Sequence, residues 1–338
     1  MYIAIACALL QYHLMFGFSQ PDFRTDGRDW PHRDWSRFHD AGGLRWHVQR
    51  HGAGPVCLLL HGTAASTHSW RGLAPLLCEH FTVVAPDLPG HGFTAALRGA
   101  RPTLGTMARL VASLCGRLGL APELVVGHSA GAAIALRMAL DGSIAPAGIV
   151  SLNGALRPFR GAAGPLSSAI AKALFVNPLA PRVFARGARN RQRVERLLQN
   201  VGSTVDDTGI DLYQRLFQSP GHVAGALAMM AHWDLSSLTD EIARLRPQLL
   251  LVATDGDRAV PPADAAVIAR LTPRATLTRL PRLGHLAHEE DPAAIAGLVE
   301  AFAAEIGVLR PEGPADDASG DVDGRCQRAE CGAQGLAN

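Results

Sequence analysis

Short apolar runs alternate with longer segments of helical periodicity from Ser36 to about Leu309. The runs are VCLLLHG, FTVVAPDLPGHG, ELVVGHSAG, AGIVSLNGA, QLLLVATDGD and ATLTRLPRLGH, and most of them close on glycine, aspartate or histidine. Continuous apolar runs between helical segments are typical of parallel strands that are covered by helices on both faces. The pattern therefore predicts an α/β fold with a mostly parallel central sheet flanked by helices.

The segment SRFHDAGGLRWHVQRHG, which comes before these runs, predicts a β-hairpin. The turn falls at residues 41–43, and Leu44, Trp46 and Val48 alternate with polar or charged residues after it. Alternation with a period of two after a glycine-rich turn indicates paired antiparallel strands. We expect the sheet to begin with an antiparallel pair.

The alternation of strands and helices stops between Asn153 and about Arg244. Roughly ninety residues there have helical patterns and no convincing strand, which is far too long for an ordinary connection between a strand and a helix. We predict an inserted helical cap over residues 154–244. It divides an α/β core into a first part, residues 21–153, and a second part, residues 245–309.

The two halves of the predicted cap differ in composition. The stretch from Arg157 to Arg196 contains eight arginines and a single acidic residue, Glu195. The second half ends in HVAGALAMMAHWDL, whose methionines and tryptophan offer large, soft apolar surface. We take Met229, Met230 and Trp233 as candidate residues of a substrate pocket. Whether the arginines bind carboxylates or face solvent or a membrane stays open.

Charge, cysteine content and the lack of certain motifs indicate which partners, cofactors and cellular compartment to expect. The chain has 338 residues, 48% of them hydrophobic, which suits one large core, and its formal net charge of +2 does not favour a nucleic-acid partner. Six scattered cysteines without a repeated metal-ligand spacing favour a reduced, cytoplasmic protein. No G-x-x-x-x-G-K-[ST] motif occurs. We predict neither a cofactor nor a metal, because His285, His288 and Glu289 in GHLAHEE have no further ligand cluster beside them.

The two ends of the chain differ from the rest. Residues 1–20 form an apolar leader, which we interpret as a start codon placed upstream of a true start at Met15, as peripheral or single-helix membrane attachment, or as a secretory signal. Residues 310–338 are poor in large apolar residues and predict a disordered tail. The tail contains Cys326 and Cys331 in a lone C-x4-C spacing. We expect a cytoplasmic protein, with membrane association left open.

The stretch VVGHSAGAAIA places Ser129 between Gly127 and Gly131, where a strand gives way to a helix. Glycines on both sides permit a sharp turn that exposes the serine hydroxyl at the start of the helix. The five-residue pattern is weak evidence on its own. It needs partners elsewhere in the chain.

Those partners follow two later strands. Asp257 ends LLLVATDGD and His285 follows LPRLG, so the chain order is serine, aspartate, histidine. A serine hydroxyl requires a base to attack a carbonyl, an imidazole supplies it, and a carboxylate fixes the imidazole tautomer. Asp255 is the competing acid, but Asp257 directly precedes RAVPP, where a loop is expected. We predict Ser129, Asp257 and His285 as catalytic residues.

The run LLLHGTAAST predicts donors for a negatively charged intermediate. A glycine at position 62 lets the backbone turn across the serine, so the amides of Thr63 and Ala130 are expected to form an oxyanion hole. The Ala130 amide lies at a helix N-terminus, where the helix dipole favours negative charge. His61 is expected to be a structural, hydrogen-bonded imidazole.

Several of these segments resemble those of the α/β-hydrolase family, from Ser36 to Leu309. More narrowly, LLLHGTAASTHSWR, APDLPGHGFT, VVGHSAGAAIALRMALDG, SLNGALRPF, HVAGALAMMAHWDL and LGHLAHEE are similar to the magnesium-chelatase accessory family of bacteriochlorophyll biosynthesis. The resemblance implies a role near magnesium insertion into protoporphyrin and association with magnesium chelatase. It also suggests that cap arginines pair with porphyrin carboxylates while Met229, Met230 and Trp233 cover the ring.

Two functions remain open from the sequence. The first is a serine hydrolase that acts through an acyl-enzyme on an ester, a thioester or a similar bond of a small molecule. The second is a non-catalytic module on a hydrolase fold, which binds a tetrapyrrole or assists a chelatase. The catalytic constellation favours the first at the level of chemistry, and the resemblance leaves room for the second.

Overall fold

A computed structural model describes residues 18–158, 177 and 179–309 of the chain. The predictions for the tail and for almost all of the leader, including Cys326 and Cys331, lie outside these residues. Among the helices in the described ranges, none combines the length and the apolar character that crossing a membrane requires.

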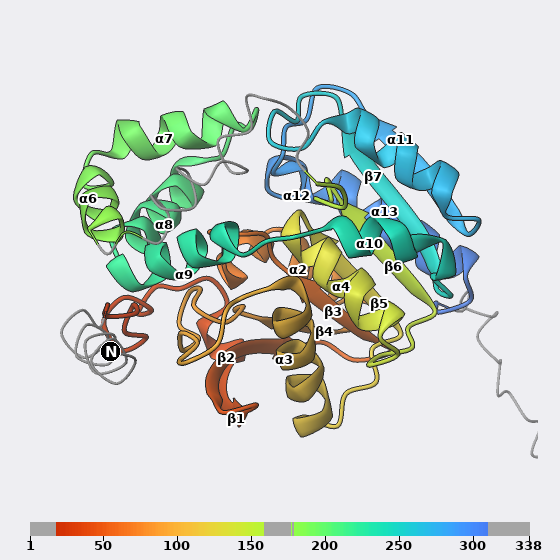
Figure 1. The fold of residues 1–338 in the computed structure, drawn as a ribbon, viewed down its shortest axis with the longest axis horizontal. Helices are drawn as coiled ribbons and strands as arrows, with labels where there is room; N and C mark the ends of the chain where they lie inside the picture. Colours follow the sequence, from red (N-terminus) through yellow and green to blue (C-terminus); the bar gives the residue numbers. More distant parts are fainter. Residues whose placement is uncertain (1–17, 159–176, 178, 310–338) are drawn as a thin grey trace, which may run out of the picture.

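Eight strands form one sheet in the order β1-β2-β4-β3-β5-β6-β7-β8 (Figure 1). β1 pairs with β2 and β2 with β4 in antiparallel fashion, and every other pair is parallel. The expected α/β class, with an antiparallel hairpin before a parallel sheet, is confirmed. The strands are β1 (Ser36–Ala41), β2 (Leu44–His51), β3 (Val56–Leu60), β4 (Thr82–Pro86), β5 (Leu124–His128), β6 (Gly148–Leu152), β7 (Gln248–Thr254) and β8 (Ala275–Leu280).

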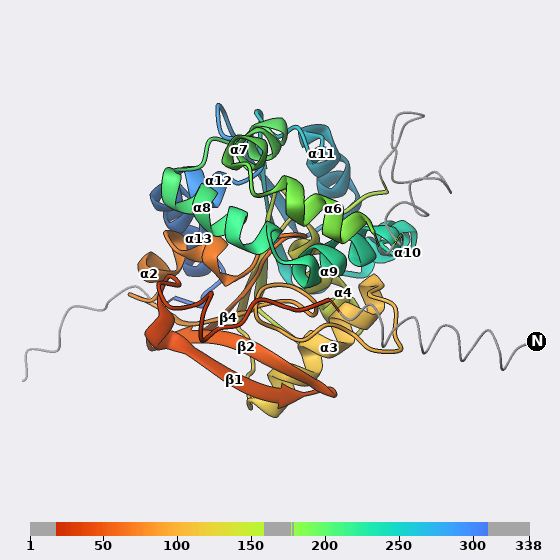
Figure 2. The ribbon, with the colours of Figure 1, turned by 90° about the vertical axis from the view of Figure 1, so that its left-hand side faces the viewer.

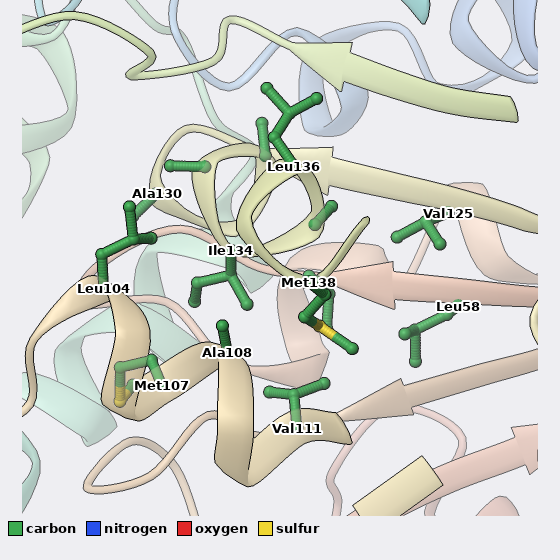
Figure 3. Close-up of a cluster of buried hydrophobic side chains, with 14 of the residues drawn as sticks. Leu58, Leu104, Met107, Ala108, Val111, Val125, Ala130, Ile134, Leu136 and Met138 are labelled. Atoms are coloured by element: carbon green, nitrogen blue, oxygen red, sulfur yellow. The ribbon is translucent and has the colours of Figure 1, made fainter. Parts of the chain in front are cut away.

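Helices cover both faces of the sheet. The side chains of a strand alternate between its faces, so apolar side chains on both faces need helices to bury them. Leu58 and Leu60 of β3 point into a cluster with α3, α4 and α11, part of which Figure 3 shows. Cys57 and Leu59 point into the opposite cluster, with α2 and α13. The elements of the two layers and their connections are η1 (Arg33–Trp35), η2 (Thr67–Trp70), α2 (Leu73–Leu77), α3 (Leu104–Arg117), α4 (Ala130–Leu140), α11 (Pro262–Leu271), α12 (Ala287–Glu290) and α13 (Pro292–Glu305).

The described residues between β6 and β7 contain helices and no strand. The first four of these helices gather at one side of the molecule (Figures 1 and 2). The last part of the segment packs on the core instead, because Leu238 and Ile242 are fully buried in the cluster that contains α4. The segment consists of α6 (Ala180–Gly187), α7 (Arg191–Asn200), α8 (Asp207–Phe217), α9 (Pro220–Ala231), α10 (Ser236–Glu241) and η3 (Ile242–Arg244).

Candidate active site

Ser129 occupies the turn between β5 and α4 with an unusual backbone conformation. Its φ and ψ are 51° and −115°, which for a residue with a side chain costs on the order of 1–3 kcal/mol. Its amide donates to the carbonyl of Leu152 at 3.0 Å. A Cβ at Gly127 would lie 2.5 Å from the backbone of Ala132, and one at Gly131 would lie 2.0 Å from the Leu60 carbonyl oxygen. Only glycines on both sides of the serine permit this turn.

His285 and Asp257 meet at the same edge of the sheet. The Nδ1–H of His285 donates to Oδ2 of Asp257 at 2.8 Å, and the Asp257 side chain is 1% exposed. Its other oxygen accepts the amides of Ala259 and Val260 at 2.7 and 2.9 Å. Asp255 instead forms an ion pair with Arg279 at the surface, where its side chain is 46% exposed. The structure therefore places Asp257, rather than Asp255, on the imidazole.

The backbone of His285 is held from two further strands. Its carbonyl oxygen accepts the Nδ2–H of Asn153, after β6, at 3.0 Å and the Nε2–H of His128, at the end of β5, at 2.9 Å. Asn153 also exchanges hydrogen bonds with Thr254 of β7. No role was predicted for Asn153 or His128 from the sequence, although both stand at strand ends, the signal that singled out Asp257.

Ser129 lies close to His285, because His128, the residue before the serine, packs against the His285 ring. The rings of His128 and His285 have centroids 4.6 Å apart. Within the described residues, no hydrogen bond joins the Ser129 hydroxyl to the His285 imidazole. A Cβ at Gly62 would lie 3.1 Å from Cβ of Ser129, so the loop after β3 crosses directly over the serine.

The loop after β3, residues 61–65, is held by backbone hydrogen bonds and by α9. His61 is buried; its Nδ1–H donates to the Gly62 carbonyl, and its Nε2 accepts the Leu88 amide at 2.9 Å. His222 of α9 donates Nε2–H to the carbonyl of Ala64, which has a φ of 65°. His222 was another residue without an assigned role, because no strand-end position marks it. The loop that carries the Thr63 amide is therefore fixed beside the N-terminus of α4, where Ala130 lies.

The three apolar pocket candidates lie at the C-terminal end of α9 and just after it. Met229 is fully buried, and its sulfur accepts the Thr63 hydroxyl at 3.8 Å. Met230 and Trp233 are partly buried, and Trp233 packs against the core cluster that contains Met229. The indole Nε1 of Trp233 has no hydrogen-bond partner within the described part of the chain.

The arginines of the same segment do not gather around these apolar residues. Arg157 forms an ion pair with Asp264 of α11, and Arg191 pairs with two aspartates of α8 at 2.5 and 2.9 Å. Three others line a surface depression of about 590 Å³ between α6 and α7 that none of the apolar candidates lines. The structure thus separates this arginine group from Met229 and its neighbours. Arg160 lies outside the described residues. The lining consists of Val183, Arg186, Gly187, Arg189, Asn190 and Arg193.

The GHLAHEE motif is built into a polar network. His288 Nε2 lies 2.8 Å from the Ser69 hydroxyl, and Glu289 accepts that hydroxyl at 2.6 Å and Tyr213 Oη at 2.7 Å. Glu289 also forms an ion pair with Arg71. Within the described ranges, no group of three or more His, Cys, Asp or Glu residues is placed to hold a metal ion.

Comparison with known proteins identifies the family. The model of the α/β hydrolase family matches residues 57–298, which is most of the chain. The chain belongs to the α/β hydrolase family.

Three further likenesses agree with this assignment. This α/β hydrolase is 40% identical over 280 residues to a protein of Rhodobacter capsulatus named magnesium-chelatase 30 kDa subunit, covering 82% of this chain and 98% of that protein. Its fold matches an α/β hydrolase fold protein from Burkholderia ambifaria with a TM-score of 0.67 and 24% identity, over 79% of this chain and 97% of the other. An esterase from Thermogutta terrifontis matches with a TM-score of 0.63 and 22% identity, over 80% and 98%.

Burial keeps several histidines around the site of this α/β hydrolase neutral. Burial lowers the pKa of His222 to about 4 and that of His288 to about 3. Nδ1 of His222 accepts the Gly92 amide and its Nε2–H donates to the Ala64 carbonyl, so the neutral tautomer with the proton on Nε2 is fixed. The other histidines whose pKa burial lowers are His61, His68, His91 and His128.

These histidines predict that acid destabilises the protein. Below a pH of about 6.5 the unfolded chain binds protons at these positions, whereas the folded His222 stays neutral down to a pH of about 4. The free energy of unfolding should therefore fall as the pH drops from 7 to 5, measured by urea denaturation. His222→Gln should reduce this dependence by about 1.4 kcal/mol per pH unit between pH 6 and 5.

The control is His80→Gln, which replaces an exposed histidine. The pH dependence should stay as it is in the parent, because an exposed side chain keeps its contact with water in both states. An equal reduction in the two variants would contradict the role of burial.

Proposed function

We propose that this α/β hydrolase is a serine hydrolase with Ser129 as nucleophile, His285 as general base and Asp257 as the carboxylate that orients it. The observation that carries the proposal is the 2.8 Å hydrogen bond from His285 to Asp257 beside a serine held at positive φ. Neither feature is needed for a sheet to fold. The strained turn and the buried carboxylate both cost stability, which is typical of a site kept for chemistry.

The reaction follows from the tautomer of His285. Donation of Nδ1–H to Asp257 leaves Nε2 without a proton, so Nε2 is the base. It removes the proton of the Ser129 hydroxyl as the oxygen attacks the carbonyl carbon of an ester or thioester. The same imidazolium then protonates the leaving group, and an acyl-enzyme remains on Ser129. A water molecule, deprotonated by Nε2, releases the acid and restores the serine.

The amides of Thr63 and Ala130 are the proposed donors to the oxyanion of the tetrahedral intermediate. Ala130 is the first residue of α4, where the amide lacks an acceptor within the helix and the dipole favours negative charge. His222 and Met229 of α9 hold the loop that presents Thr63. A preorganised donor needs no rearrangement when charge develops, and each such donor is worth about 3 kcal/mol of barrier.

The substrate in this proposal is a small molecule with an ester-type bond, and its acyl group contacts Met230 and Trp233, with the fully buried Met229 packed behind them. We propose that α6 to α9 form the cap over this pocket, within the predicted cap of residues 154–244. The Rhodobacter relative is named as a subunit of magnesium chelatase. On that basis we propose that this chain also associates with a magnesium chelatase and acts on a tetrapyrrole or on an ester of that pathway.

A fluorophosphonate probe tests the nucleophile without assuming a substrate. The probe should modify the protein covalently, and peptide mass spectrometry should place the adduct on Ser129, because only an activated serine reacts with it. Ser129→Ala should abolish labelling. Ser113→Ala, which removes an exposed serine on α3, should leave labelling unchanged. A folded protein that takes no label, or takes it elsewhere, would refute the proposal.

A further inference from the structure

The outer surface of α6 and α7 combines exposed arginines with exposed large apolar side chains. Both helices lie at the periphery of the molecule (Figures 1 and 2). Leu179, Val183 and Leu197 have 59%, 70% and 40% of their surface exposed. Beside them lies the 590 Å³ depression between the helices. We call this surface the α6–α7 patch, which consists of Leu179, Val183, Arg186, Arg189, Arg193 and Leu197.

The residues of the patch follow one another along a continuous stripe. Leu179 and Val183 are four positions apart, and so are Arg193 and Leu197, so the members of each pair lie on the same side of the chain. Val183 and Arg193 both line the depression and join the two pairs across the turn. Ala185 is buried on the side of α6 opposite Val183, and Val194 of α7 is buried next to the stripe. The stripe is thus the side of α6 and α7 on which large apolar side chains stay exposed among the described residues.

The α6–α7 segment has a net positive charge, unlike the rest of the chain taken together. Residues 179–200 contain six arginines and one glutamate, a formal charge of +5, whereas the whole chain carries +2, so the remainder carries −3. Arg191 is used internally, in ion pairs with α8. Arg186, Arg189 and Arg193 form no ion pair with any residue in the described ranges. Three guanidinium groups around one depression therefore offer a site that attracts an anionic partner.

We propose that the α6–α7 patch binds the surface of a bilayer that contains anionic phospholipid. The depression receives phosphate groups on its arginines, and Leu179, Val183 and Leu197 enter the headgroup region beside them. A free anion would contact the arginines alone. It would leave the exposed apolar side chains in water, where they contribute nothing to binding. A lipid surface satisfies both, because phosphates and acyl chains lie side by side in it. The proposal does not rest on the reaction at Ser129.

Vesicle binding tests this proposal with the full chain. Vesicles of phosphatidylglycerol and phosphatidylcholine should sediment the parent protein, and vesicles of phosphatidylcholine alone should not. The triple variant Arg186→Gln, Arg189→Gln, Arg193→Gln should bind the anionic vesicles at least about tenfold more weakly, since each lost arginine removes attraction to the surface. Val183→Asp should weaken binding independently, with the arginines intact.

The matched control removes the same charge elsewhere. Arg98, Arg101 and Arg117 are exposed on α3 and the loop before it, and their triple replacement by glutamine should leave vesicle binding within twofold. Ser129→Ala should also leave it unchanged. Equal loss in both triple variants, no loss in the patch variants, or equal binding to neutral vesicles would overturn the proposal. Thermal melts of the variants confirm that each compared protein is folded.

Discussion

Asp257→Asn is expected to lower kcat by about 10⁴ while leaving KM within a few-fold. An asparagine keeps the shape of the side chain but lacks the charge that stabilises the imidazolium. Its Nδ2–H group can also donate a hydrogen bond to Nδ1 of His285. The imidazole then adopts the other tautomer, and its Nε2 carries a proton when the reaction needs a base. Initial rates of p-nitrophenyl acetate hydrolysis over a range of concentrations separate the two constants.

The chain offers a control two residues away. Asp255→Asn removes an acid that is bound to Arg279 at the surface rather than to His285, so kcat should stay within about twofold, because an exposed ion pair contributes little. Similar losses in both variants, or an active Asp257→Asn protein, would contradict the assignment. Comparable melting temperatures exclude unfolding as the cause.

Gly131→Ala is expected to lower the free energy of unfolding by about 3 kcal/mol or more, or to prevent folding. The new Cβ would lie 2.0 Å from the Leu60 carbonyl oxygen and 2.7 Å from that of His61. Both are backbone atoms at the end of β3, so relief requires α4 to move away from the sheet. Urea denaturation measures the change, and the yield of folded protein reports the more severe outcome.

Gly297→Ala is the matched control for this substitution. Gly297 lies within α13, and a Cβ added to it would meet no atom within 4 Å. Alanine should therefore stabilise the protein by about 0.5–1 kcal/mol, since the helix favours it over glycine. A Gly131→Ala protein as stable as the parent would show that α4 and β3 do not need this close approach.

The sequence predicted the sheet well because buried parallel strands leave a strong signal. Every apolar run that was taken as a strand contains one, and the turn between β1 and β2 comprises residues 42 and 43, with Ala41 already in β1. The same strand-end reasoning favoured Asp257 over Asp255, and the structure bonds Asp257 to the imidazole. Asn153 and His128 also stand at strand ends, but no role was predicted for either, because their hydrogen bonds to the His285 carbonyl cannot be read from the sequence.

The sequence by itself determined the class of fold and the turn at Ser129. The alternation of apolar runs and helices requires an α/β sheet, because each strand must bury both faces, and the glycines around Ser129 require a sharp turn. Only the tertiary structure decided which distant groups meet. It holds the carbonyl of His285 from two strands, ties the loop after β3 to α9 through His222, and separates the arginines of α6 and α7 from Met229. The last two of these arrangements depend on how the helices between β6 and β7 pack on the core, and composition alone does not specify that packing.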